Sequence, residues 1–268
     1  MLNKLLLFTL AILLGNSLFS QNILIGPKPS FWKDEKGKHL SFNKEDSLFY
    51  TGFLDSVYTG IAYTKVKFHH KKYKSQIRIV NGLINGDLLV YDKKGHLLAK
   101  EHQIAGLAQD SSIAWYPNGN LEYIKIFKDA KLNGYYVEFY PNGKIRIEGY
   151  NKNDKGVGVW KEYYEDGKLH KECDYKDGED TVMVTFYSAT GHMNEKAQLV
   201  NGIWNGIDQE FYITGKLRAE FYNLNDKKNG PYKRWEGAIL VEEGQYKNDK
   251  KVGIWKIYKD EKTEEVKY

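Results

Sequence analysis

A glycine returns every 24 residues along most of this chain. The first series of these glycines is Gly95, Gly119, Gly143, Gly167, Gly191 and Gly215, and Gly237 follows after 22 residues. The second series is Gly86, Gly134, Gly158, Gly206, Gly230 and Gly253. Asp110 and Val182 occupy the two places where the second series lacks a glycine. This regularity indicates one supersecondary unit copied about seven to eight times.

The residues around the first series predict tight turns between extended segments. Asn-Gly or Asp-Gly pairs stand at 118–119, 142–143 and 166–167, and such pairs accept the positive φ that closes a β-hairpin. The chain has 21 Tyr, 12 Phe and 6 Trp, which favour strands, and its mature part lacks helical spacing of apolar residues. The sequence therefore predicts an all-β protein, an elongated antiparallel sheet of consecutive β-hairpins with two strands of about six to seven residues per repeat.

The beginning of the chain departs from the repeat. Lys4 precedes the apolar run 5–14, and small and polar residues follow, which is typical of a secretory signal peptide cleaved near Ser20. We therefore expect residues 1–20 to be removed and the mature protein to be periplasmic or extracellular. No cysteine follows the apolar run, so we do not expect a lipoprotein. Residues 21–80 are interpreted as a divergent N-terminal cap or degenerate repeat, and 81–268 as the repeat domain.

Charge and cysteine content exclude some classes of partner and stabilisation. The chain has 40 Lys and Arg against 35 Asp and Glu, a net charge of +5, and the charges are interspersed. Such a mild excess does not favour nucleic acid as a partner. The one cysteine, Cys173, cannot form an internal disulfide, and we expect it to be a buried small apolar residue.

The sequence contains no motif that indicates catalysis or a cofactor. It has no nucleophile elbow, phosphate-binding loop or zinc-binding helix motif. Residues 151–162 imitate a calcium loop only superficially, because the first ligand position is Asn151 and Lys155 stands where a ligand belongs. We therefore expect a protein that is not an enzyme and has neither a cofactor nor a metal site.

Tyrosines stand three or four residues before most turn glycines of the first series. They are Tyr91, Tyr116, Tyr140, Tyr164, Tyr187 and Tyr212. We interpret Tyr91 and Tyr187 as members of the same row in turns that are longer by one residue. Equivalent residues of successive hairpins lie roughly 9–10 Å apart, so the tyrosines are expected to form a ladder. This candidate binding site either packs neighbouring repeats together or offers an aromatic platform to a glycan or an extended peptide.

The turns opposite the first-series glycines carry lysine and aspartate together, as at 152–155, 225–228 and 248–251. A periodic basic edge could touch anionic lipid, although the interleaved aspartates cancel much of its field. A membrane surface is therefore one alternative partner.

Residues 158–169 read Gly-Val-Trp-Lys-Glu-Tyr-Tyr-Glu-Asp-Gly-Lys-Leu, and variants of this pattern begin at Gly134, Gly206 and Gly253. The pattern resembles the MORN-repeat variant of bacterial YwqK-type proteins. The resemblance implies a sheet of consecutive hairpins and a role in interaction rather than catalysis. Some proteins of this type are described as antitoxins, and other MORN-containing proteins as membrane or phospholipid binders.

Together these features predict an exported scaffold for protein–protein interaction. Three alternatives stay open: a carbohydrate or cell-wall-binding module that uses the tyrosine ladder, an antitoxin or immunity protein, and a phospholipid-binding protein.

Overall fold

The protein is all-β. A computed structural model describes residues 32–43, 45, 47–52, 56–68, 71–175, 181–259 and 262–268, and these residues form 22 strands and no helix. The strands pair antiparallel in consecutive hairpins, as predicted. The predicted signal peptide lies outside the described residues.

Two units make up the described chain, and the boundary between them runs through β12 (Ile145–Lys152). Strands of the N-terminal unit are β1 (Trp32–Lys33), β2 (His39–Asn43), β3 (Leu48–Thr51), β4 (Ser56–Val57), β5 (Gly60–Phe68), β6 (Lys71–Val80), β7 (Leu83–Tyr91), β8 (Leu97–Ile104), β9 (Leu107–Trp115), β10 (Leu121–Lys128) and β11 (Lys131–Phe139). Strands of the C-terminal unit are β13 (Lys155–Tyr163), β14 (Leu169–Tyr175), β15 (Thr181–Tyr187), β16 (Met193–Val200), β17 (Ile203–Phe211), β18 (Leu217–Leu224), β19 (Lys227–Glu236), β20 (Ile239–Lys247), β21 (Lys250–Lys259) and β22 (Lys262–Lys267).

Each repeat contains two kinds of turn. In the turn that follows β13, the Gly167 N–H donates to the Tyr164 carbonyl, Gly167 has φ +91°, and Asp166 Oδ1 accepts the Lys168 N–H. We call the turns with a first-series glycine tip turns. In the opposite turn after β18, Asn225 and Asp226 both have positive φ, 52° and 64°, which matches the twist of the flanking strands.

Most strands are longer than the sequence predicts. β11 and β13 contain 9 residues each and β12 contains 8, whereas β14 and β15 contain 7. The reason is that two-residue turns leave almost every neighbouring residue free to join the ladder. Asp110, which replaces a second-series glycine, has φ +58°, so a short polar residue adopts the left-handed backbone there.

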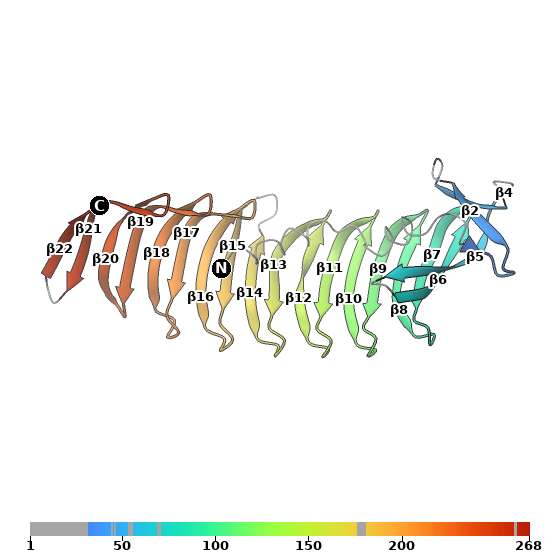
Figure 1. Cartoon of the computed structure of the whole chain (residues 1–268), viewed down its shortest axis with the longest axis horizontal. Coiled ribbons are helices and arrows are strands. Elements are labelled where there is room, and N and C mark those ends of the chain that lie inside the picture. The colour runs from blue at the N-terminus through green and yellow to red at the C-terminus, as the bar shows by residue number, and fades with distance from the viewer. Residues whose placement is uncertain are drawn as a thin grey trace. The chain divides into compact units, whose positions relative to one another are not determined.

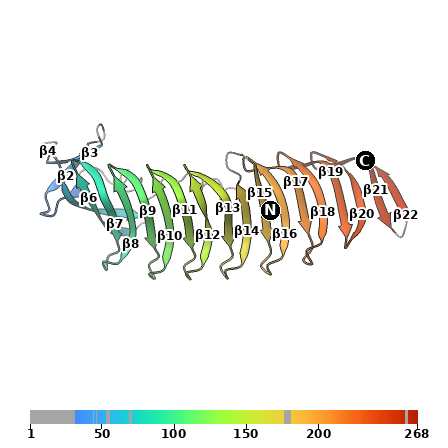
Figure 2. The same ribbon diagram turned by 180° about the vertical axis from the view of Figure 1, so that it is seen from behind.

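Strands pair in the order of the sequence within each unit. Figures 1 and 2 both show β13 to β22 side by side in that order in the C-terminal unit. The N-terminal unit continues the same pattern from β5 to β11, and β1 pairs with both β2 and β5. Trp32, Leu40 and Phe49 of β1 to β3 join one buried cluster with residues of β5 to β9. These first strands therefore cover one face of the sheet at its start.

In the C-terminal unit, one row of neighbouring residues on one face of the sheet crosses the strands from β13 to β21. We call it the central row, and its members, one from each of the strands β13 to β21, are Trp160, Cys173, Val184, Ala197, Asp208, Phe221, Tyr232, Gly244 and Trp255, the last two of which are in contact rather than a register pair. All except Tyr232 and Gly244 are buried. We call this side of the sheet the ring face and the other side the open face. Cys173 is buried as expected, and burial raises the pKa of its thiol to about 11.

Candidate interaction surface

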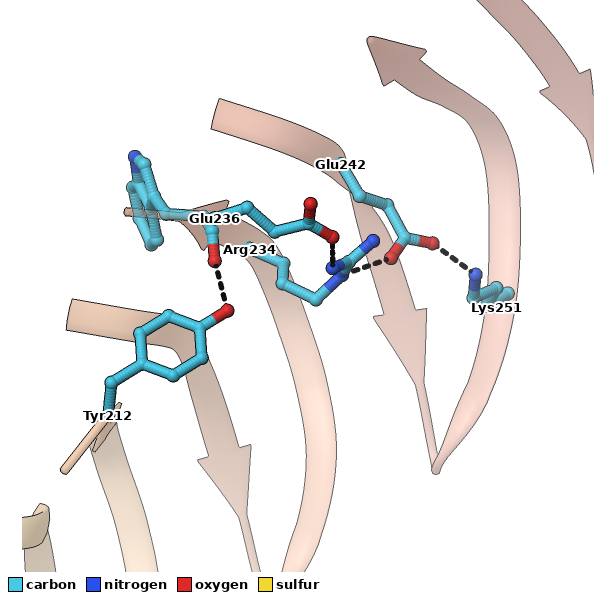
Figure 3. Close-up of polar contacts among 6 residues, drawn as sticks. Tyr212, Arg234, Glu236, Glu242 and Lys251 are labelled. Atoms are coloured by element: carbon cyan, nitrogen blue, oxygen red, sulfur yellow. Dashed lines mark hydrogen bonds and ion pairs between the residues drawn. The ribbon is translucent and has the colours of Figure 1, made fainter. Parts of the chain in front are cut away.

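The tyrosine ladder is tied to the backbone of the following repeat. The hydroxyl of Tyr116 donates to the Phe139 carbonyl at 2.8 Å, that of Tyr164 to the Tyr187 carbonyl at 2.9 Å, and that of Tyr212 to the Trp235 carbonyl at 2.8 Å. Figure 3 shows the last of these bonds. These hydroxyls already have partners, which supports the packing alternative for the ladder.

Tyr91 and Tyr187 belong to a different row from the other tyrosines. The tip turns at Asp92 and Ser188 have the same hydrogen bonds as the turn at Tyr140, so they are not longer by one residue and that part of the prediction is wrong. Asp92 and Ser188 take the place of the ladder tyrosine. Tyr91 and Tyr187 are instead the last residues of β7 and β15.

The aspartates of the opposite turns join each hairpin to the preceding one by two hydrogen bonds. We call each such pair of bonds an aspartate staple. Asp226 donates its N–H to the Trp204 carbonyl at 3.1 Å, and its Oδ1 accepts the Trp204 N–H at 2.9 Å. Asp154 and Asp249 bind Leu132 and Lys228 in the same way. The lysine-aspartate turns are therefore explained by sheet assembly, without any need for a lipid partner.

The calcium-loop-like pattern of the sequence has a structural explanation. Residues 151–162 form the end of β12, a turn at Asn153 and Asp154 with positive φ, and β13. Within the described ranges, no group of three or more His, Cys, Asp and Glu residues is placed to hold a metal ion.

The open face of the C-terminal unit exposes apolar side chains that folding does not bury. Val159, Ile207, Tyr222 and Ile254 are between 41% and 56% exposed, and Met183 is partly exposed. We call these five residues the apolar row. Four of the five occupy one repeat position: the residue after a second-series glycine or after its replacement Val182. Tyr222 pairs directly with Ile207 on the neighbouring strand.

A row of mixed charge lies beside the apolar row on the open face. Its charged members, in the order of the strands and with Thr185 and Gln209 between some of them, are Lys161, Glu172, Lys196, Glu220, Lys233, Glu243, Lys256 and Glu265. Its four lysines and four glutamates leave this strip without net formal charge. The open face therefore combines apolar side chains, with exposed Asp174 between Val159 and Met183, and a charge-balanced row beside them, which is the mixed composition of a protein-binding surface.

Ion pairs on the ring face join three strands of the same unit. Arg234 contacts Glu236 at 2.9 Å and Glu242 at 3.1 Å, and Lys251 contacts Glu242 at 2.6 Å (Figure 3). Burial would raise the pKa of Glu242, but hydrogen bonds from Lys251 and Arg234 lower it below its ordinary value. These charges stabilise the sheet and are already paired.

The apolar row was missed by reasoning from sequence, although a signal for it was present. In the repeats of the C-terminal unit, the position after the second-series glycine is apolar like the buried positions, so periodicity alone cannot tell an exposed residue from a core residue. An exposed residue and a core residue differ in the side of the sheet on which they lie, and only the strand pairing shows that side. Ile207 pairs with Tyr222, next to the buried pair Asp208 and Phe221, so Ile207 and Tyr222 lie on the opposite side.

Comparison with known proteins finds a similar repeat in part of the chain. Three consecutive segments, 112–129, 132–153 and 157–177, match the MORN repeat variant. No curated protein matches the sequence. In the part of the chain that the structure describes, no helix has the length and apolar character needed to cross a membrane. MORN repeats are in general protein-binding or membrane-binding repeats, and three units of this chain are similar to the MORN repeat variant.

Proposed function

We propose that this protein is an exported, non-enzymatic scaffold that binds another protein through the apolar row on the open face of its C-terminal unit. The observation that carries the proposal is the exposure of Val159, Ile207 and Ile254 at one repeat position. Exposed side chains contribute little to folding, so their recurrence is better explained by contact with a partner.

A protein partner is favoured over the other classes. The adjoining row of alternating lysine and glutamate has no net formal charge, so it gives anionic lipid no electrostatic advantage. The tyrosines of the ladder are half-buried and the hydroxyls of Tyr116, Tyr164 and Tyr212 bind backbone carbonyls, so the ladder already serves contacts between repeats rather than a glycan. An antitoxin or immunity role would be a special case of protein binding.

The test compares three forms of the full chain as bait in an envelope extract. The first is wild type, the second carries Ile207→Ser and Ile254→Ser, and the third carries Ile213→Ser and Ile239→Ser. Ile213 and Ile239 are exposed apolar residues at tip turns, outside the apolar row, so the third form is a matched control. We expect one protein to be retained in stoichiometric amount by wild type and control and lost by the row variant.

Equal retention by all three forms contradicts the proposal. So does binding of wild type to phosphatidylglycerol vesicles or to purified wall glycan with no protein partner. Export is checked separately by intact mass of the protein recovered from the envelope, which we expect to lack residues 1–20.

A further inference from the structure

Asp208 is an acid in a row of apolar residues. The central row has Trp160, Val184, Tyr232 and Trp255 at the equivalent place in other repeats, but Asp208 in β17. Only 4% of Asp208 is exposed. Its Oδ2 accepts the Asn223 Nδ2–H at 2.9 Å, while its Oδ1 has no hydrogen-bond donor within the described structure.

Two more carboxyl groups stand beside Asp208. Glu195 of β16 lies directly opposite Glu210 of β17, and the next central-row pair along these strands is Ala197 with Asp208. Like charges directly opposed across strands destabilise a sheet. The Glu210 carboxylate has the Arg218 guanidinium at 2.6 Å, but Glu195 and Asp208 have no ion-pair partner within the described residues.

The surroundings favour a proton on this pair. Burial first, and the Glu195 carboxyl second, raise the pKa of Asp208 to about 7, against the lowering effect of Asn223 and Lys228. Burial and then Glu210 raise the pKa of Glu195, while a hydrogen bond with Asp208 lowers it. Two coupled acids of this kind titrate as a pair, with one proton retained near neutral pH.

Glu101 of β8, in the N-terminal unit, supplies a contrast. Glu101 is also buried there, but its direct neighbours across the strands are Leu88 and Ser112, and its Oε1 accepts the Gln103 Nε2–H at 2.8 Å. A buried acid in this fold is therefore not always beside another acid, and the cluster in β16 and β17 is particular to that place.

We infer that Glu195 and Asp208 share a proton that holds β16, β17 and β18 together, and that loss of this proton loosens these strands. Without the proton, two carboxylates lie on neighbouring strands, one of them, Asp208, buried away from water and the other, Glu195, half-buried. The bond between Asp208 and Asn223 joins β17 to β18, so repulsion at Asp208 acts on both strands.

The same strands carry two residues of the apolar row. Ile207 and Tyr222 form the pair next to Asp208 and Phe221, and they project from the opposite side of the sheet. Loosening would therefore disturb the proposed docking residues, so binding would weaken as the pH rises from about 4 to about 7. This consequence rests on the proposed function, whereas the proton-dependent loosening does not.

Amide hydrogen exchange of the full chain, corrected for the intrinsic pH dependence of exchange, tests the inference without a partner. In wild type, we expect amides of β16 to β18 to lose about tenfold or more in protection between pH 5 and pH 8, relative to β20 and β21. Asp208→Asn should abolish this relative loss, because the amide is neutral and can donate to Glu195. Asp174→Asn, which removes an exposed carboxylate of the same unit, should behave as wild type.

A uniform change in protection across the C-terminal unit in wild type would overturn the inference. If Asp208→Asn fails to fold, carbon-detected NMR titration of the wild-type Asp208 carboxyl decides instead: a midpoint near 7 supports the shared proton, and one near the ordinary value of 3.8 contradicts it. Failure of the docking experiment leaves both readouts unaffected, so the two proposals fail separately.

Discussion

The indole of Trp255 lies directly against Gly244 of the neighbouring strand. A Cβ placed on Gly244 would come within 2.2 Å of Trp255 Cδ2, and Trp255 is fully buried. Gly149 and Trp160 repeat this relationship, with a Cβ-to-Cδ2 distance of 2.3 Å. Glycine is required at these places because a broad ring needs the space above the strand, and φ at Gly149 and Gly244 is not in the left-handed region.

Gly244→Ala should destabilise the C-terminal unit by about 1–3 kcal/mol, because the added methyl displaces a buried ring in a close-packed row. Urea unfolding followed by tryptophan fluorescence measures the change. Gln245→Ala, at the exposed neighbouring residue on the open face, should change the free energy of unfolding by about 0.5 kcal/mol or less. Equal effects of the two substitutions would contradict the packing explanation.

Tyr212→Phe removes only the hydroxyl that binds the Trp235 carbonyl, and the ring remains. We expect a loss of about 1 kcal/mol in the free energy of unfolding, typical of one hydrogen bond whose acceptor keeps some access to water. Tyr222→Phe is the matched change in the exposed apolar row and should leave stability unaltered. If the unfolding midpoint of Tyr212→Phe equals that of wild type, the hydrogen bond does not stabilise the sheet, and the alternative that the ladder is an open binding platform is favoured.

Asp226→Ala should cost about 1–3 kcal/mol, because it removes the acceptor of the Trp204 N–H and places alanine at a positive φ. Asp226→Asn keeps both an acceptor and a side chain that tolerates this backbone, so it should lie close to wild type. Thermal unfolding of the three forms measures the difference. If Asp226→Asn loses as much thermal stability as Asp226→Ala does, then the charge of Asp226, rather than its hydrogen bonds to Trp204, stabilises the sheet.

Acid should weaken the C-terminal unit through Glu242. The folded-state pKa of this carboxyl is lowered, so its contribution is complete above the unfolded value near 4.5 and is lost as the pH falls through the lower folded value. Glu242→Gln should remove about 1 kcal/mol at neutral pH and flatten this acid limb. The measurement is the free energy of unfolding of wild type and variant from pH 2 to pH 7. If the variant loses as much stability in acid as wild type does, the assignment to Glu242 is contradicted.

The pH dependence that Asp208 contributes has the opposite sign. Its pKa is raised in the folded state, so stability is lost as the pH rises from about 4 to about 7.

Glycine spacing was sufficient to predict the hairpins, because the turns that need positive φ recur at fixed intervals. Gly95, Gly119 and Gly143 all adopt positive φ, as expected. Spacing could not identify the acceptors of the tyrosine hydroxyls, since a backbone carbonyl leaves no mark in the sequence. The length argument for Tyr91 failed for a related reason: Asp92 fills the ladder position with a polar residue whose side chain closes the same turn.

Side-chain identity alone gave no indication of the site at Asp208. A chain with 35 acids offers many close pairs in sequence, and only the register shows that Glu195 and Glu210 are opposed while Asp208 is buried beside them. The apolar row depended on the same information, because a shift of one residue exchanges the two faces of a strand. Strand register, rather than composition, therefore reveals the carboxyl cluster at Asp208 and the apolar row.

The hydrogen bonds that tie one repeat to the next reach only a short way along the chain. The tyrosine bonds span 23 residues and the aspartate staples 21 or 22. Contacts this local mean that a new hairpin can dock as soon as it is complete, using the preceding hairpin as its template. Assembly within each unit can therefore keep pace with a chain that is delivered gradually, and it requires no wait for a distant segment to arrive.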